Sequence, residues 1–488
     1  MRAQKQFDLD LVLRWLESSM PKAFYRQVSD TERALIASSL LSFHWQESFV
    51  TLRSAERAYC ITINDENADL RALEAFKDKE IWDYRTFVSC EKSPFFDHPC
   101  PLRIIVIHFL DASDPSDEPL SENVQNDIWQ SLEARNISFD KKSFNSLIND
   151  LSRPFLSLLP QESLVVTLDL LLRSRTEDDA NEFEILPEIF WKQMQRPSMQ
   201  IILAVKPVQQ NHYLRLLMKL VKRHGLFVQR INSTLVAPHS ATGQLLVVFS
   251  LHGLDNRPVW EVTKIPEFLR ELAMLKMLPK EDLFEEVLVD GNHISSTMAH
   301  LLRAVSVWVH QMLVPLDGNL YSFENVKEAF LRHPQLAKQI GELFNLRLHP
   351  QRFHLESYKN EKEKIISAIS RLNTGHSAAD ARRHNIFLQA IYFIDNTLKT
   401  NFFKANKLGL SFRVDPKVLE HLPYNRQEFF PKVPFAIFFI RCTQSFGFHI
   451  RFRDLARGGL RTILPKKSEQ LVYERSQIFK EAYNLALT

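Results

Sequence analysis

The stretch FGFHIRFRDLARGGLR occupies residues 446–461 and opens with a strict alternation of apolar and basic or small side chains. Residues on one face of a strand recur every second position, so this period predicts a strand with one apolar and one basic face. A sheet containing this strand would present cations in a row. The apolar set is Phe446, Phe448, Ile450 and Phe452, and the other set is Gly447, His449, Arg451 and Arg453.

Two glycines flanked by arginines follow the alternating stretch, as Arg457, Gly458, Gly459 and Arg461. Paired glycines permit a sharp turn and a close backbone approach to a ligand. The planar arginine fork grips a carboxylate through two hydrogen bonds, each worth about 1.5–3 kcal/mol when charge-assisted. The pattern therefore favours a dicarboxylate, although a phosphate satisfies the same groups. The alternative is a solvated basic edge strand that opposes aggregation.

The sequence before this stretch supplies its expected neighbours. Residues 434–440 form a continuous apolar run, which predicts a central strand covered on both faces. Four of the eleven glycines fall after Lys399, where helical patterns give way to strands and loops. A new domain is therefore expected near residue 400.

Three segments in this region resemble the large-subunit NAD-dependent glutamate dehydrogenases. They are LKTNFF at 398–403, SFRVDP at 411–416 and FHIRFRDLARGGLR at 448–461, in the order found in that family. The resemblance implies that the Gly-Gly turn lies in the substrate domain. It also implies that Arg457 replaces the lysine with which smaller relatives hold the glutamate side-chain carboxylate. Gly458, Gly459 and Arg461 match as further substrate-binding residues, and Arg451, Arg453 and Asp454 as supporting ones.

The same resemblance implies an activity and a missing part. The family transfers hydride from the glutamate α-carbon to NAD, and a lysine-activated water then releases ammonium and 2-oxoglutarate. The glycine-rich loop bearing that lysine, and the NAD domain, follow this region in the family, whereas this sequence stops at Thr488. We therefore expect an amino-terminal, regulatory portion that holds no catalytic residue, binds no NAD itself and is inactive alone. Its expected partners are the carboxyl-terminal half of the enzyme or further copies of the chain.

Two earlier segments share one order of elements. A strand, a helix and two more strands are predicted from Tyr59 to Phe109, with Asn67 capping the helix, and again from Ile201 to Leu251, with Gly225 ending the helix. An internal duplication follows. Such units, completed by a further helix and strand, resemble ACT modules, which bind small amino acids and adjust attached enzymes. For each unit, the alternative is a ferredoxin-like sandwich without a ligand. For the whole chain, the alternative is a non-enzymatic amino-acid sensor or scaffold.

The predicted organisation is a helix-rich α+β chain of several domains. The stripe formed by Leu301, Leu302, Val305, Val309 and Met312 is typical of a core, or of a seam for a partner helix. The predicted parts are a helical lead-in (1–56), an ACT-like unit (57–115), a helical segment with an acidic connector at 173–184 (116–198), a second ACT-like unit (199–290), a helical hub (291–400) and the start of a truncated α/β substrate domain (401–488).

Composition excludes several classes. A net charge of +3 is too small for a nucleic-acid surface, and no apolar run reaches the length of a membrane span. The amino terminus lacks the apolar segment of a signal peptide, so a cytoplasmic location is expected. The four cysteines have no Cys-x-x-Cys spacing, which argues against structural zinc. Neither a G-x-G-x-x-G motif nor a P-loop occurs, so no standard nucleotide site is expected.

The missing enzyme half also predicts an exposed patch. The apolar strand at 434–440 and the last helix, from about Ser468, would lose their usual cover. Exposed apolar surface of that size drives association between molecules. We therefore expect the chain to self-associate.

Overall fold

The computed structural model spans the whole chain and describes most of its residues. The backbone alone is described in β5 and β13. The described ranges are 8–41, 49–54, 56–95, 100–110, 122–134, 140–151, 153–156, 158–159, 161–176, 182–185, 198–205, 210–237, 243–278, 282–351, 354–372, 375–404, 407, 409–429, 432–442, 445–453 and 456–462.

Internal contacts divide the chain once, into residues 1–276 and 277–488. Both units mix helices with antiparallel sheet, as the α+β prediction requires. The finer boundaries predicted from the sequence stay predictions, and each unit is described by itself.

Unit 1 is built on an eight-stranded sheet in the order β1-β2-β4-β3-β7-β8-β6-β5, antiparallel throughout. Its β-branched and apolar strands are buried on both faces at the centre, as expected of a sheet between two helical layers. The strands are β1 (Phe49–Arg53), β2 (Arg57–Ile63), β3 (Ile81–Ser93), β4 (Cys100–Phe109), β5 (Glu182–Ile185), β6 (Met199–Val205), β7 (Leu226–Val236) and β8 (Gln244–Gly253).

The sheet contains the same split β-α-β arrangement twice. In the first module, β2, α4 (Ala68–Ala75), β3 and β4 follow one another, and β4 inserts between β2 and β3. In the second, β6, α10 (Gln210–Arg223), β7 and β8 do the same. The predicted strand, helix, strand, strand order is confirmed in both modules. Gly225 ends α10 with a φ of +66°, as predicted.

Three details of these modules were predicted wrongly. The outer strand of each module precedes it instead of following it. These outer strands are β1, within the expected helical lead-in, and β5, within the expected acidic connector. Asn67 occupies the N-cap position of α4 without capping it, because its side chain accepts from Lys222 instead. The acidic residues 177–179 of the connector lie outside the described residues.

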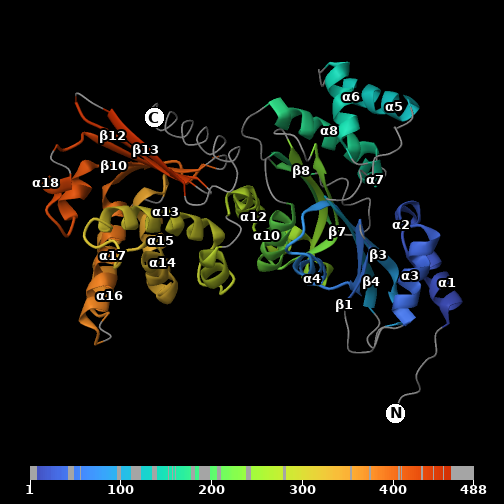
Figure 1. Ribbon diagram of the computed structural model, residues 1–488, viewed down its shortest axis with the longest axis horizontal. Helices are drawn as coiled ribbons and strands as arrows, with labels where there is room; N and C mark the ends of the chain where they lie inside the picture. Colours follow the sequence, from blue (N-terminus) through green and yellow to red (C-terminus); the bar gives the residue numbers. More distant parts are fainter. Residues whose placement is uncertain are drawn as a thin grey trace, which may run out of the picture. The chain divides into compact units, whose positions relative to one another are not determined.

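Helices cover both faces of the eight-stranded sheet (Figure 1). Tyr59, Val106, Val248 and Ile202 lie in one row of paired residues and therefore on one face. Tyr59 and Val106 pack against the amino-terminal helices, and Val248 and Ile202 pack against the helices before β5. The helices α4 and α10 lie on the opposite face. The covering helices are α1 (Leu9–Ser19), α2 (Lys22–Gln27), α3 (Asp30–Leu41), α5 (Glu122–Glu133), α6 (Lys141–Asp150), α7 (Arg153–Leu156) and α8 (Gln161–Thr176), and η1 (Leu254–Asn256), α11 (Val259–Val262), α12 (Ile265–Met274) and η2 (Leu275–Met277) follow β8.

Unit 2 places helices on one face of a five-stranded antiparallel sheet (Figure 1). All pairings between its described strands are antiparallel, and the α/β substrate domain expected at 401–488 stays a prediction. The elements are η3 (Phe284–Val289), α13 (Ser296–Leu313), α14 (Phe323–Arg332), α15 (Pro334–Leu348), α16 (Leu355–Ser370), α17 (Ser377–Asn396), β9 (Thr397–Thr400), β10 (Leu410–Val414), η4 (Pro416–His421), α18 (Arg426–Phe429), β11 (Ala436–Arg441), β12 (Ser445–Arg451) and β13 (Ala456–Thr462), and the sheet order is β13-β12-β11-β10-β9.

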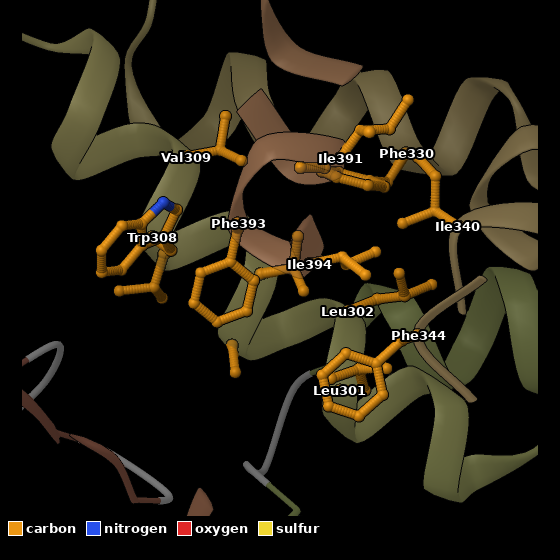
Figure 2. Close-up of a cluster of buried hydrophobic side chains, with 14 of the residues drawn as sticks. Leu301, Leu302, Trp308, Val309, Phe330, Ile340, Phe344, Ile391, Phe393 and Ile394 are labelled. Atoms are coloured by element: carbon orange, nitrogen blue, oxygen red, sulfur yellow. The ribbon is translucent and has the colours of Figure 1, made fainter. Parts of the chain in front are cut away.

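One hydrophobic core joins these helices to the sheet. The predicted apolar stripe of α13 is buried in it, so the stripe is core and not a seam for a partner helix. Figure 2 shows Trp308 of α13 beside Phe393 of α17, and their ring centroids lie 4.9 Å apart. The Trp308 ring also contacts Phe439 of β11 and Phe448 of β12. The boundary predicted near residue 400 therefore lies between helices and strands that share one hydrophobic core.

β11 is central in the sheet and buried at all six positions, which confirms the strand predicted at 434–440. Ala436, Phe438 and Ile440, on the face away from the helices, are 1–6% exposed. Residues 436–440 therefore lack the predicted exposed patch, whereas Phe435, at the start of the predicted strand, and Val433 just before it are exposed. The last helix lies outside the described residues.

Candidate functional site

β12 has the two faces that its alternation predicted. Phe446 and Phe448 join the core beneath the sheet. His449 lies on the other face, where its ring centroid is 6.0 Å from that of its directly paired neighbour Phe438. Arg451 shares this face, is exposed, and donates from Nε to Nε2 of His449 at 3.3 Å. Arg453 is exposed beyond the end of the strand.

The expected Gly-Gly turn is a strand. Gly458 and Gly459 lie inside β13, paired with His449 and Phe448 of β12. The chain reverses between Arg451 and Ala456, where these two strands meet. The glycines therefore lie side by side with the alternating segment, which a turn at this point would not allow. Asp454 lies outside the described residues.

The pairing of β12 with β13 separates the basic residues of the two strands, although they are close in the sequence. Arg457 pairs with Ile450 and Arg461 pairs with Phe446, the apolar positions of β12. His449 and Arg451 pair instead with Gly458 and Ala456. No basic residue of β12 is thus opposite an arginine of β13.

The three resembling segments meet in one row of the sheet. Lys399 of β9 pairs with Arg413 of β10, Arg413 with Phe438 of β11, and Phe438 with His449 of β12. Directly paired residues of antiparallel strands share a face, so Lys399, Arg413 and His449 lie in a row on the face that also carries Arg451. We call Lys399, Arg413, His449 and Arg451 the basic face.

Sequence reasoning found half of the basic face and missed Lys399 and Arg413. The available signal was their place in LKTNFF and SFRVDP. Strand order was the missing information, because β11 separates β10 from β12 in space while the sequence separates them by more than thirty residues. Burial, and then the neighbouring Arg451, lower the pKa of His449, so the neutral imidazole is favoured on this face.

The loop between β9 and β10 is fixed by its own polar groups. Asn401 donates to the carbonyl of Gly409 and accepts from the amide of Ser411, both at 2.9 Å. Buried Lys407 donates to the carbonyls of Phe402 and Lys404. These hydrogen bonds fix the loop that joins β9 to β10, and with it the position of Lys399 opposite Arg413.

A cluster of buried ionisable residues lies beneath the sheet at the start of α13. Arg303 pairs with Asp282 and Glu285, and both nitrogens of fully buried His300 lack a hydrogen-bond partner. Burial, followed by the charges of Arg303, Arg441 and Lys407, holds the pKa of His300 well below its usual value. The unpartnered atoms of His300 are closed to solvent, so we assign this cluster a packing role.

The described residues do not fit NAD. A dinucleotide diphosphate needs a glycine at the turn from a strand into a helix, so that the backbone can approach it. Among described glycines, Gly253 has that position, but an added Cβ would meet Val262 at 2.3 Å and the Arg257 carbonyl at 2.9 Å. Protein atoms already fill that space.

Two kinds of feature are absent from the part of the chain that the structure describes. No three His, Cys, Asp or Glu side chains are placed to hold a metal ion. No described helix has the length and apolar character needed to cross a membrane.

The region that contains the basic face is similar to proteins of known function. Residues 372–471 match the family of bacterial NAD-glutamate dehydrogenase catalytic domains. Glutamate dehydrogenase 2 of Dictyostelium discoideum is 34% identical over 187 residues, which cover 36% of this chain and 16% of that protein. The NAD-specific glutamate dehydrogenase of Neurospora crassa is 35% identical over 127 residues, covering 26% and 11%. That of Saccharomyces cerevisiae is 39% identical over 105 residues, covering 21% and 8%.

These matches confirm the resemblance stated from the three segments. The matched region extends the resemblance upstream, to include α17. The chain spans less than a fifth of the length of these three relatives.

Proposed function

We propose that this chain, whose residues 372–471 match the catalytic domain of bacterial NAD-glutamate dehydrogenases, is a portion of such an enzyme that supplies regulation and part of the glutamate site. The reaction is the oxidative deamination of L-glutamate to 2-oxoglutarate and ammonium. Catalytic lysine and NAD domain come from polypeptide outside this chain. Because the described residues do not fit NAD, no hydride-transfer step is assigned to them, and the chain alone is proposed to be inactive.

The observation that carries this proposal is the pairing of β12 with β13. Arg457, Gly458, Gly459 and Arg461 lie in β13, next to β12, and both strands belong to the segment FHIRFRDLARGGLR that resembles the family. Arg457 is proposed to hold the glutamate side-chain carboxylate, since a guanidinium binds a carboxylate through two parallel hydrogen bonds. The glycines, which have no side chains, let the substrate approach the backbone. Arg451, Arg453 and Asp454 are proposed to support this site.

The two split β-α-β modules of unit 1 are proposed to be the regulatory part. Their continuous sheet supports the ACT-like interpretation, in which a small amino acid acts as effector. The chain is proposed to work in the cytoplasm, with the remainder of the dehydrogenase or further copies of itself. The alternative function is a non-enzymatic amino-acid sensor. The experiment below distinguishes this sensor from a portion of a dehydrogenase.

The test is glutamate-dependent reduction of NAD, measured with this chain alone and with polypeptide carrying the remainder of the catalytic region. We expect activity in the mixture only. Arg457→Ala should raise KM for glutamate strongly, Arg457→Lys should restore much of the affinity, and Arg426→Gln, outside the sheet, should change nothing. No activity in either sample, together with amino-acid binding by the chain, would favour the sensor.

A further inference from the structure

The first module of unit 1 contains an open pocket between the start of β1 and the exposed side of α4. Its volume is about 720 Å³, within the range of about 300–1,000 Å³ that is usual for small-ligand sites. None of the residues around it is fully buried, so the pocket opens to solvent. Its lining residues are Phe49 of β1, Asn67 at the N-cap position, and Leu70, Arg71, Glu74 and Ala75 of α4.

Strand pairing and one hydrogen bond fix the two walls of this pocket relative to each other. Phe49 pairs directly with Thr62 of β2, so both side chains lie on the same face of the sheet. Thr62 accepts a hydrogen bond from Nη2 of Arg71 at 2.8 Å, which ties α4 to that face. Phe49, Leu70 and Ala75 are the apolar part of the lining. A ligand with an apolar side chain therefore gains by leaving water here.

The polar lining residues are held in place by neighbours and still have hydrogen-bonding capacity for a ligand. Arg71 donates from Nη1 to Asp65 at 2.9 Å, in addition to its bond with Thr62, and a guanidinium has further Nη hydrogens.

Asn67 accepts from Lys222 of α10 through Oδ1 at 2.8 Å, while its Nδ2 donates to none of the residues that the structure describes. Glu74 accepts from Arg215 of α10 through Oε1 at 2.8 Å, which leaves Oε2 for a ligand. These polar groups therefore need little reorganisation to bind a ligand.

The ionic groups around the pocket balance in charge. The three ion pairs are Arg71 with Asp65, Arg215 with Glu74 and Lys222 with Glu66, at N–O distances of 2.9, 2.7 and 3.4 Å. A ligand with a net charge of either sign gains little from such a balanced set. A zwitterion bonds to both signs, because Arg71 and Asn67 offer donors for a carboxylate and Glu74 offers an acceptor for an ammonium group.

We propose that this pocket binds a zwitterionic amino acid with an apolar side chain. Its carboxylate is bound by Arg71 and Asn67, and its ammonium group by Glu74. The site rests on the regulatory role proposed for unit 1, and it gives that role a location and a ligand class. Because Lys222 and Arg215 belong to α10 of the second module, a ligand that orders Asn67 and Glu74 also strengthens the contact between the two modules.

The test is isothermal titration of the full chain with L-leucine and, separately, with L-phenylalanine. We expect saturable binding of at least one of them. The compounds 4-methylpentanoate and 3-methylbutylamine keep the leucine side chain but lack its ammonium or its carboxylate group, so each should bind about tenfold more weakly than L-leucine.

Two variants examine the pocket itself. Ala75→Phe fills the pocket and Arg71→Met removes the carboxylate donor, and each should weaken binding about tenfold or more. The matched controls are Ala381→Phe and Arg14→Met, at exposed helical positions outside the pocket, which should bind as the unaltered chain does.

Three results would overturn the site: no saturable binding of either amino acid, binding of 4-methylpentanoate as tight as that of L-leucine, or undiminished binding by a folded Ala75→Phe chain. Should Ala75→Phe fail to fold, Arg71→Met decides the question, because its partly exposed ion pair contributes little to folding. Because the readout is binding, it is independent of NAD reduction. A mixture that reduces NAD with a chain that binds neither amino acid would overturn this site and leave the proposed dehydrogenase function intact.

Discussion

At the scale of single residues, buried charge is concentrated where the two modules of unit 1 join. Fully buried Arg103 of β4 donates to Asp69 of α4 at 2.6 Å and to the carbonyl of Val228 in β7 at 3.1 Å. Tyr84 of β3 donates to the same carboxylate at 2.8 Å. Arg103 thus links a helix and a strand of different modules, which its place in the sequence could not reveal.

Replacing Arg103 should be costly because Asp69 would stay buried without its cation. We expect Arg103→Met to lower the free energy of unfolding by about 3–5 kcal/mol, measured by chemical denaturation. Adding Asp69→Asn should recover part of that loss. The matched control is Arg71→Met, whose partly exposed pair with Asp65 should be worth less than about 1 kcal/mol. Equal losses in both variants would contradict the buried-pair argument.

His108 should make unit 1 sensitive to acid. Burial and the charges of Arg57 and Arg85 lower its pKa to about 4, against 6.5 in the unfolded chain. Between these values the unfolded chain binds a proton that the folded chain excludes, so stability falls as pH falls from 6.5 towards 4. The total loss in the free energy of unfolding between these two pH values is on the order of 3 kcal/mol.

Denaturation midpoints measured from pH 7.5 to pH 4 should show that loss. His108→Gln should flatten the profile because a glutamine side chain does not titrate, while its oxygen can still accept from Arg57. His376→Gln, at an exposed position, serves as the control and should leave the profile unchanged. A His108→Gln profile as steep as that of the unaltered chain would rule out this origin of the pH dependence.

At the scale of elements, the core of unit 2 depends on contacts between helices and strands. Trp308 is fully buried and its ring meets aromatic rings of α17, β11 and β12. Trp308→Ala should therefore lower the free energy of unfolding by about 3–5 kcal/mol. Trp260→Ala removes a tryptophan that is 42% exposed and should cost far less. Similar denaturation curves for both variants would show that α13 does not hold the sheet.

The elements also show what the sequence could predict. Periodicity found the strand at 434–440 and the two faces of β12, since alternating or continuous apolar residues report burial directly. It missed β1 and β5, because short edge strands pair on one side and carry little pattern. It mistook Gly458 and Gly459 for a turn, since glycine permits a turn without requiring one.

At the scale of the whole molecule, the repeated order of elements within unit 1 could be predicted from the sequence, but the joining of the two modules into one sheet could not. The joint between the modules is a backbone ladder of three pairs, Asp83 with Thr234, Tyr84 with Ser233 and Arg85 with Asn232. Side chains extend it: Trp82 donates to the Leu235 carbonyl at 3.1 Å, and Thr86 bonds both backbone groups of Ile231. Pairing of strands so distant in sequence depends on the folded geometry of both modules.

This joint predicts how fragments of unit 1 behave. A fragment of residues 1–276 keeps β3 paired with β7 and should be monomeric, with one cooperative unfolding transition. A fragment of residues 1–110 leaves the edge of β3 unpaired, and an unpaired edge recruits another strand, so it should self-associate. Light scattering across a hundredfold range of protein concentration distinguishes them. A monomeric, cooperatively folded 1–110 fragment would show that the first module is complete without its partner, and that the continuous sheet adds little to its stability.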